Sequence, residues 1–250
     1  MDIQTPALLI EGKLYDERTS DEHDAYSSPQ SLTDGLDDTD SSDLRSLLCK
    51  DAIRHADTKT FWSSKRVRDI ITVPRIVEQL HKHGHSHDRA QSIAHKISGS
   101  CLQIFAALTW HEREGDIGAF LREGIVDSDL PFVRAEVKNA HLTCKIARRD
   151  QPSAPLACFS NWSISAREFF LSEQHRFVPA VFGFEPGTNT IRHMNYSPAV
   201  VLPLTQSKAI RDGGFGSVKE VEVHPDCHGF HDILHSVCLT LNLDVFLTDS

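Results

Sequence analysis

The stretch that decides the fold of the C-terminal part of the chain is IRDGGFGSV at residues 210–218, which continues as KEVEVHP at residues 219–225. Valines recur through its second half, as is typical of a β-strand. Glycines at 213, 214 and 216 mark a turn, because glycine adopts backbone conformations that other residues avoid. Backbone N–H groups of such a turn can reach phosphate oxygens, since no side chains intervene. The stretch therefore predicts two strands joined by a turn that can cover a charged ligand.

Two other kinds of phosphate-binding loop do not fit this stretch. A P-loop needs Gly-Lys-Ser or Gly-Lys-Thr at the start of a helix, and the sequence contains neither. A dinucleotide-binding loop also leads into a helix, whereas this turn leads into a valine-rich strand. An ordinary β-hairpin without a ligand remains the simplest alternative.

The acidic residues are concentrated near the N-terminus. Residues 16–43 hold ten acidic residues and one basic residue, which accounts for the formal net charge of −9. The other 25 acidic and 25 basic residues balance. Because residues 1–41 contain few large apolar side chains, we predict that they are disordered. An electrically balanced body behind an acidic segment argues against nucleic-acid binding, which usually requires a basic face.

Residues 42–125 show helical periodicity and predict a small helical bundle. Ser42 is placed to cap a first helix, and Pro74 to open a second one that ends at Gly84. Asp116 is placed to cap a short last helix. One long helix is expected from apolar residues at spacings of three and four, namely Ile93, Ile97, Cys101, Ile104 and Leu108.

The remaining sequence mixes short apolar runs with turn residues. Residues 126–199 are expected to form a mixed connecting region with one short helix at 163–174, and residues 200–250 to form strands. Short strands are expected at Val181-Phe182 and at residues 200–202. The C-terminal residues alternate in hydrophobicity and predict a third strand beside the hairpin. The expected fold class is α+β, with a disordered acidic N-terminus, a small helical bundle and a β-rich C-terminal part.

Three stretches together resemble one protein family. They read GAFLREGIVDSDLPF at residues 118–132, FLSEQHRFVP at residues 170–179, and DGGFGSVKEVEVHPDCHGFHD at residues 212–232. This combination resembles a group of fungal protein kinase-like proteins, in which a helical N-terminal region precedes a serine/threonine kinase domain. The resemblance spans residues 44–232. It implies that residues 200–250 begin a kinase N-lobe, that ATP is the ligand of the turn, with Mg²⁺ in the family, and that phosphotransfer is the family's activity.

The glycine-rich loop of kinases has the pattern G-x-G-x-x-G-x-V. Carried over by the resemblance, the expected nucleotide-binding residues are Ile210, Gly213, Gly214, Phe215, Gly216 and Val218. Arg211 stands where the first glycine of the pattern would be. The last lysine, Lys219, directly follows the loop valine and so cannot be the third-strand lysine that holds the nucleotide phosphates. We therefore expect weak ATP binding and no catalytic residue in this chain. The sequence departs from the family pattern after Asp232. We interpret it as a truncated kinase sequence, shortened either biologically or in its gene model.

Two histidine clusters allow a metal-binding alternative. Histidines alternate through residues 81–87, where we expect an exposed loop between two helices. A second cluster consists of His224, Cys227, His228 and His231, for which the resemblance implies a loop between two strands. The first cluster lacks the ligand spacing of a structural zinc site. Because of the loop position that the resemblance implies for the second cluster, no metal ligand is assigned there either, and metal binding stays an alternative.

A different class of function also stays open, because the helical region could bind a protein partner without catalysis. No secretory signal or membrane span is visible in the sequence, and the six cysteines form no Cys-x-x-Cys pair. We therefore expect an intracellular protein, cytoplasmic or nuclear, with reduced thiols and without a membrane partner.

Overall fold

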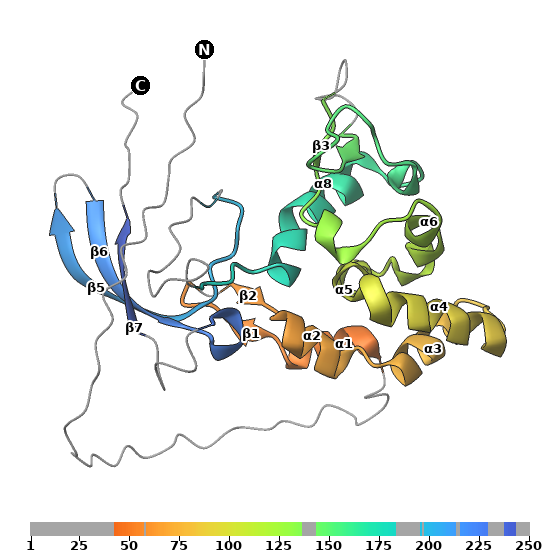
Figure 1. The fold of residues 1–250 in the computed structure, drawn as a ribbon, viewed down its shortest axis with the longest axis horizontal. Helices are drawn as coiled ribbons and strands as arrows, with labels where there is room; N and C mark the ends of the chain where they lie inside the picture. The colour runs from red at the N-terminus through yellow and green to blue at the C-terminus, as the bar shows by residue number, and fades with distance from the viewer. Residues whose placement is uncertain are drawn as a thin grey trace.

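In the computed structural model, the described residues are 43–57, 59–136, 144–183, 196, 198–213, 216–229 and 238–243. They form an α+β structure in which a helical body lies beside an antiparallel sheet (Figure 1). The predicted disordered segment, residues 1–41, lies outside the described residues. No helix among the described residues is long and apolar enough to cross a bilayer.

The helical body contains helices of six to fourteen residues, several 3-10 turns and two very short hairpins. Its α-helices are α1 (Leu44–Lys50), α2 (Ser64–Ile70), α3 (Val73–Lys82), α4 (His87–Ser100), α5 (Leu102–Trp110), α6 (Ile117–Arg122) and α8 (Ile164–Glu173). Its 3-10 helices are η1 (Glu114–Asp116), η2 (Asp127–Asp129), η3 (Ala157–Phe159) and η4 (Gln174–Phe177). The hairpins pair β1 (Ile53–Arg54) with β2 (Thr60–Phe61), and β3 (Val133–Arg134) with β4 (Ile146–Ala147).

Helix ends follow local signals in part. Gly84 has a positive φ of 81° beyond the end of α3, as the sequence predicts. The helix α8 lies within the predicted range 163–174, and the Ser163 hydroxyl caps it by accepting the Ala166 N–H. The cap of α1 is Asp43 instead of Ser42, because the Asp43 carboxylate accepts the Ser46 N–H. Asp116 stands before α6 without capping it, since its carboxylate accepts the Trp162 indole N–H at 2.9 Å.

The long helix expected through Cys101 is broken there, so that prediction was wrong. The Cys101 backbone leaves the helical region (φ −132°, ψ 27°), and its thiol donates to the Ile125 carbonyl at 3.0 Å. A second helix then starts, because the Asp127 carboxylate accepts the Ile104 N–H at 3.0 Å. A side chain from a distant part of the sequence thus caps α5 and stabilises a helix start that periodicity cannot predict.

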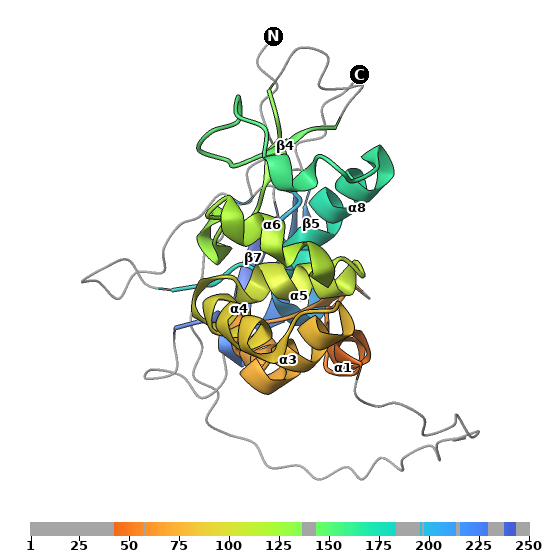
Figure 2. The same cartoon turned by 90° about the vertical axis from the view of Figure 1, so that its right-hand side faces the viewer.

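One hydrophobic core contains residues from the helices α1 through α6, from α8 and from η4. Figure 2 shows α5 lying between α3 and α4 on one side and α6 and α8 on the other. Trp62, fully buried, stacks on Phe177 with ring centroids 4.7 Å apart and lies 4.9 Å from Trp110. Its indole N–H donates to the Leu48 carbonyl at 2.9 Å. Residues far apart in the sequence therefore close this core, and side-chain packing supplies most of its stability.

A half-buried histidine lies at the edge of the core, at the C-terminal end of α5. The His111 ring packs on Phe169 and Phe170, and its Nε2 has no hydrogen-bond partner among the described residues. Burial, and then the positive charges of Arg45 and Arg176, lower the pKa of His111 to about 4. The folded protein therefore keeps this ring neutral in mildly acidic solution, where the unfolded chain takes up a proton.

We expect stability to fall between pH 6.5 and pH 4 in part because of His111. Below pH 6.5 the His111 side chain of the unfolded chain binds a proton that the folded protein does not bind. The stability that the neutral ring contributes is therefore complete above pH 6.5 and shrinks as the pH approaches 4. After allowance for solvent screening, His111 accounts for a loss of about 2 kcal/mol in the free energy of unfolding between pH 6.5 and pH 4. His111→Phe should reduce the pH slope of urea-unfolding free energies in this window without loss of stability at pH 7.5, and parallel profiles of variant and wild type would contradict this.

The sheet has the strand order β5 (Leu204–Gly213), β6 (Gly216–Val223) and β7 (Cys238–Leu243), with both neighbouring pairs antiparallel. The predicted third strand is confirmed by β7. The strands predicted at Val181-Phe182 and residues 200–202 are absent from the described residues, where Phe182 forms only an isolated bridge with His228. The Val201 carbonyl instead accepts the Ala180 N–H, and that of Pro203 accepts the His224 N–H, so this segment's carbonyls are used outside a ladder.

Candidate nucleotide-binding hairpin

The glycine-rich stretch lies at the tip of the β5–β6 hairpin. Gly213 is the last residue of β5 and pairs with Gly216, the first residue of β6. Gly214 and Phe215, the other expected loop residues, lie outside the described residues. The two strands predicted on either side of the glycines are confirmed as an antiparallel pair.

The register places the remaining expected residues around this tip. Val218 pairs with Arg211, the residue that replaces the first glycine of the kinase pattern. The pairing shifts between Ala209 and Arg211, so Ile210 lies at a β-bulge. A bulge bends a strand and increases its twist. The structure therefore brings Ile210, Gly213, Gly216 and Val218 to one end of a single hairpin.

The third strand runs alongside the hairpin up to the same end. Leu243 pairs with Ser217, and Asn242 pairs with Val218. The sequence of β7, CLTLNL, contains no lysine. Asn242 is thus the residue of β7 that lies opposite Val218 in the strand pairing, and its side chain is a neutral amide.

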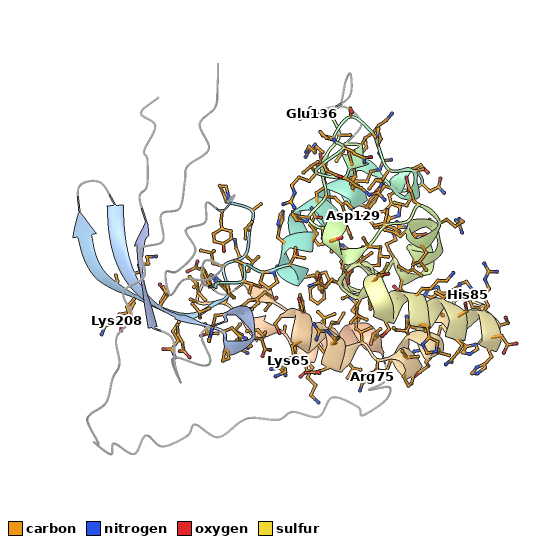
Figure 3. The ribbon with its side chains drawn as sticks, viewed as in Figure 1. Lys65, Arg75, His85, Asp129, Glu136 and Lys208 are labelled. Carbon is orange, nitrogen blue, oxygen red and sulfur yellow. The ribbon has the colours of Figure 1, made fainter. Side chains whose placement is uncertain are left out.

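The opposite end of the hairpin is anchored to the helical body. The Ala56 N–H donates to the Leu204 carbonyl at 2.8 Å, and the Phe61 ring meets the His224 ring edge-on at 6.0 Å. Beyond β6, the 3-10 helix η5 (Pro225–Cys227) adds Cys227 to a small apolar cluster with Ile53 and Phe61. The hairpin therefore extends from a fixed base, while residues 206–209 of β5 are exposed (Figure 3).

A buried polar contact completes this anchor. The Ser63 hydroxyl accepts the Arg66 N–H at the start of α2 and donates to the Asp226 carboxylate at 2.9 Å. Lys65 lies 3.5 Å from the same carboxylate. Burial by itself raises the pKa of Asp226, but the Ser63 hydrogen bond and the Lys65 charge outweigh burial and hold that pKa below its ordinary value. Asp226 is thus held ionised as a structural link.

Two of the stretches that carry the family resemblance make structural contacts with each other. Gln174, from the second stretch, is fully buried and its amide bonds both the N–H and the carbonyl of Phe132, from the first stretch. Glu123 accepts the N–H groups of Ala157 and Cys158, both at 2.8 Å. These side chains join segments within the helical body. Their roles depend on contacts across the sequence, for which the sequence holds no local signal.

The second histidine cluster lies in the anchor. His224 packs on Phe61, and Cys227 is buried, with its pKa raised to about 12 by burial and by the nearby Asp226. Without a bound metal, burial therefore keeps this thiol protonated. His231 lies outside the described residues, within which no group of three or more potential metal ligands occurs.

Comparison with protein-family models, with curated proteins and with solved structures finds no significant match to this chain.

Proposed function

We propose that this chain carries the opening strands of a protein-kinase-like N-lobe, set beside a helical region, and that its glycine turn covers the phosphates of ATP. The observation that supports the proposal most strongly is the hairpin: β5 and β6 meet at Gly213 and Gly216, and β7 joins β6 antiparallel. In kinases a glycine-rich loop between two strands is followed along the chain by a third strand, which carries the nucleotide-binding lysine. The three resemblance-bearing stretches add support from the sequence.

The 250-residue polypeptide is expected to transfer no phosphate by itself. Phosphoryl transfer depends on a lysine for the nucleotide phosphates, an aspartate base and an aspartate that holds Mg²⁺. The sequence contains neither an HRD nor a DFG motif, and β7 has no lysine. The glycine turn supplies backbone donors but none of the charges that neutralise a triphosphate. Binding a protein partner through the helical region, the alternative function, stays a prediction.

The test is a calorimetric titration of Mg·ATP into matched variants. Wild type should show no saturable binding below about 1 mM, because each missing charge-assisted contact costs roughly 1.5–3 kcal/mol. Asn242→Lys places a lysine opposite Val218 and should tighten binding roughly tenfold or more. The charge-matched control is Gln206→Lys, at an exposed position of β5 away from the turn, which should change affinity little.

The glycines supply a second control. Adding Gly213→Val and Gly216→Val to Asn242→Lys should abolish the gain, since side chains then block the approach of phosphate to the backbone. No variant should incorporate labelled phosphate into protein substrates. Equal binding by Asn242→Lys and Gln206→Lys would overturn the proposed phosphate site. Micromolar binding by wild type would contradict the expectation that the missing charges make binding weak.

A further inference from the structure

Two histidines meet where α3 gives way to α4, at the opposite end of the molecule from the sheet (Figure 3, near His85). His81 belongs to the last turn of α3, and His87 is the first residue of α4. Their rings stack with centroids 5.5 Å apart and planes inclined by 15°. The Nε2 of His81 lies 3.3 Å from the Nδ1 of His87. Both residues are exposed, so solvent ions can reach the pair.

The nitrogen–nitrogen separation suits a shared metal ion. Two imidazole nitrogens at about 2.0–2.1 Å from a tetrahedral zinc ion lie about 3.3–3.4 Å apart. Without a metal, one of the two nitrogens must carry the proton that joins them. Because both rings are exposed, small rotations are enough to direct both lone pairs at an ion that replaces this proton.

A backbone contact already orients the first ligand. The Nδ1 of His81 lies 3.0 Å from the carbonyl oxygen of His85, to which it donates its proton. That tautomer leaves the lone pair on Nε2, the atom nearest His87. Metal-bound histidines usually have such an outer hydrogen bond, which fixes the tautomer and the ring orientation. The turn through Gly84 therefore brings the second ligand and the outer hydrogen-bond acceptor together.

Two neighbouring side chains, Lys82 and His83, have other partners. Lys82 lies 3.7 Å from Glu78, and the Nε2 of His83 lies 3.1 Å from the Glu114 carboxylate. The described residues contain no third ligand grouped with His81 and His87, so water would complete the coordination of a bound ion.

We propose that His81 and His87 chelate one divalent transition-metal ion of the zinc type and so clamp the end of α3 to the start of α4. Imidazole nitrogen is a preferred ligand of Zn²⁺, Cu²⁺ and Ni²⁺, whereas Mg²⁺ and Ca²⁺ prefer oxygen. The site is separate from the glycine turn, and its existence does not depend on nucleotide binding.

The experiment is a calorimetric titration of ZnCl₂ into the full chain without an affinity tag. Wild type should bind one ion at this site, and His81→Ala or His87→Ala should each weaken that binding roughly tenfold or more. His95→Ala removes an exposed histidine from the same helix, α4, and should change affinity less than about twofold. MgCl₂ should give no comparable binding. Absence of saturable zinc binding by wild type, or unchanged binding by the His81→Ala/His87→Ala double variant, would overturn the proposal.

Discussion

Replacing Trp62 with alanine is expected to lower the free energy of unfolding by about 4–6 kcal/mol, the largest loss among the changes considered. Truncation of a buried tryptophan typically costs about 3–5 kcal/mol, and the lost indole hydrogen bond adds about 1 kcal/mol. The fully buried ring touches Phe177 and Trp110, so its removal leaves a cavity where three separate segments meet. The Leu48 carbonyl also loses the indole N–H. Total stabilities are usually about 5–15 kcal/mol, so Trp62→Ala should be largely unfolded or close to it.

Urea unfolding followed by far-UV circular dichroism checks this expectation. Trp62→Phe keeps an aromatic ring and should lose only about 1–2.5 kcal/mol. Phe169→Ala removes an aromatic ring that is 56% exposed, and should cost less than about 1.5 kcal/mol. If Trp62→Ala unfolded with a midpoint like that of Phe169→Ala, the central role of this stack would be wrong.

Gln174→Leu is expected to destabilise the protein by about 3–5 kcal/mol while preserving its side-chain volume. The Gln174 amide accepts the Phe132 N–H at 2.8 Å and donates to the carbonyls of Phe132 and Leu171. Leucine leaves both backbone groups of Phe132 without this partner in a buried site, and each such group costs about 1–3 kcal/mol. The melting temperature should fall by roughly 6–20 °C.

The matched control is the same substitution at an exposed glutamine. Gln91 lies on the outer face of α4, where its amide contacts only His95 among the described residues. Gln91→Leu should therefore change stability by less than about 0.5 kcal/mol. Similar effects of the two substitutions, measured by differential scanning calorimetry, would show that the buried amide does not hold residues 130–132 against η4.

The glycine turn illustrates how far sequence patterns reach. Glycines followed by a valine-rich stretch predict a hairpin, and β5 and β6 form an antiparallel pair on either side of them. The bulge at Ile210 and the pairing of Asn242 with Val218 became visible only in the strand register of the structure. The sequence alone does not predict them, because pairing between strands depends on how the whole sheet packs. The nucleotide as ligand rests on the resemblance and stays a proposal.

The histidines show the same division. Alternation through residues 81–87 indicates an exposed connection, and sequence spacing gives no zinc-site pattern. His81 and His87 are six residues apart in the sequence. The turn at Gly84 between α3 and α4 brings the Nε2 of His81 to 3.3 Å from the Nδ1 of His87. Ligand spacing along the chain therefore could not have indicated this pair.

Local residue patterns were enough for a short helix within residues 163–174, the end of α3 near Gly84 and the third strand, because helical periodicity, glycine turns and alternation act within a few residues. They were not enough at Cys101, where periodicity continues but the helix does not. There Asp127, 23 residues from Ile104, supplies the cap. Likewise, Ser63 and Asp226 are 163 residues apart, and their hydrogen bond exists only because packing brings α2 and η5 together. Such contacts depend on the free energy of the whole folded chain, which no short stretch of sequence contains.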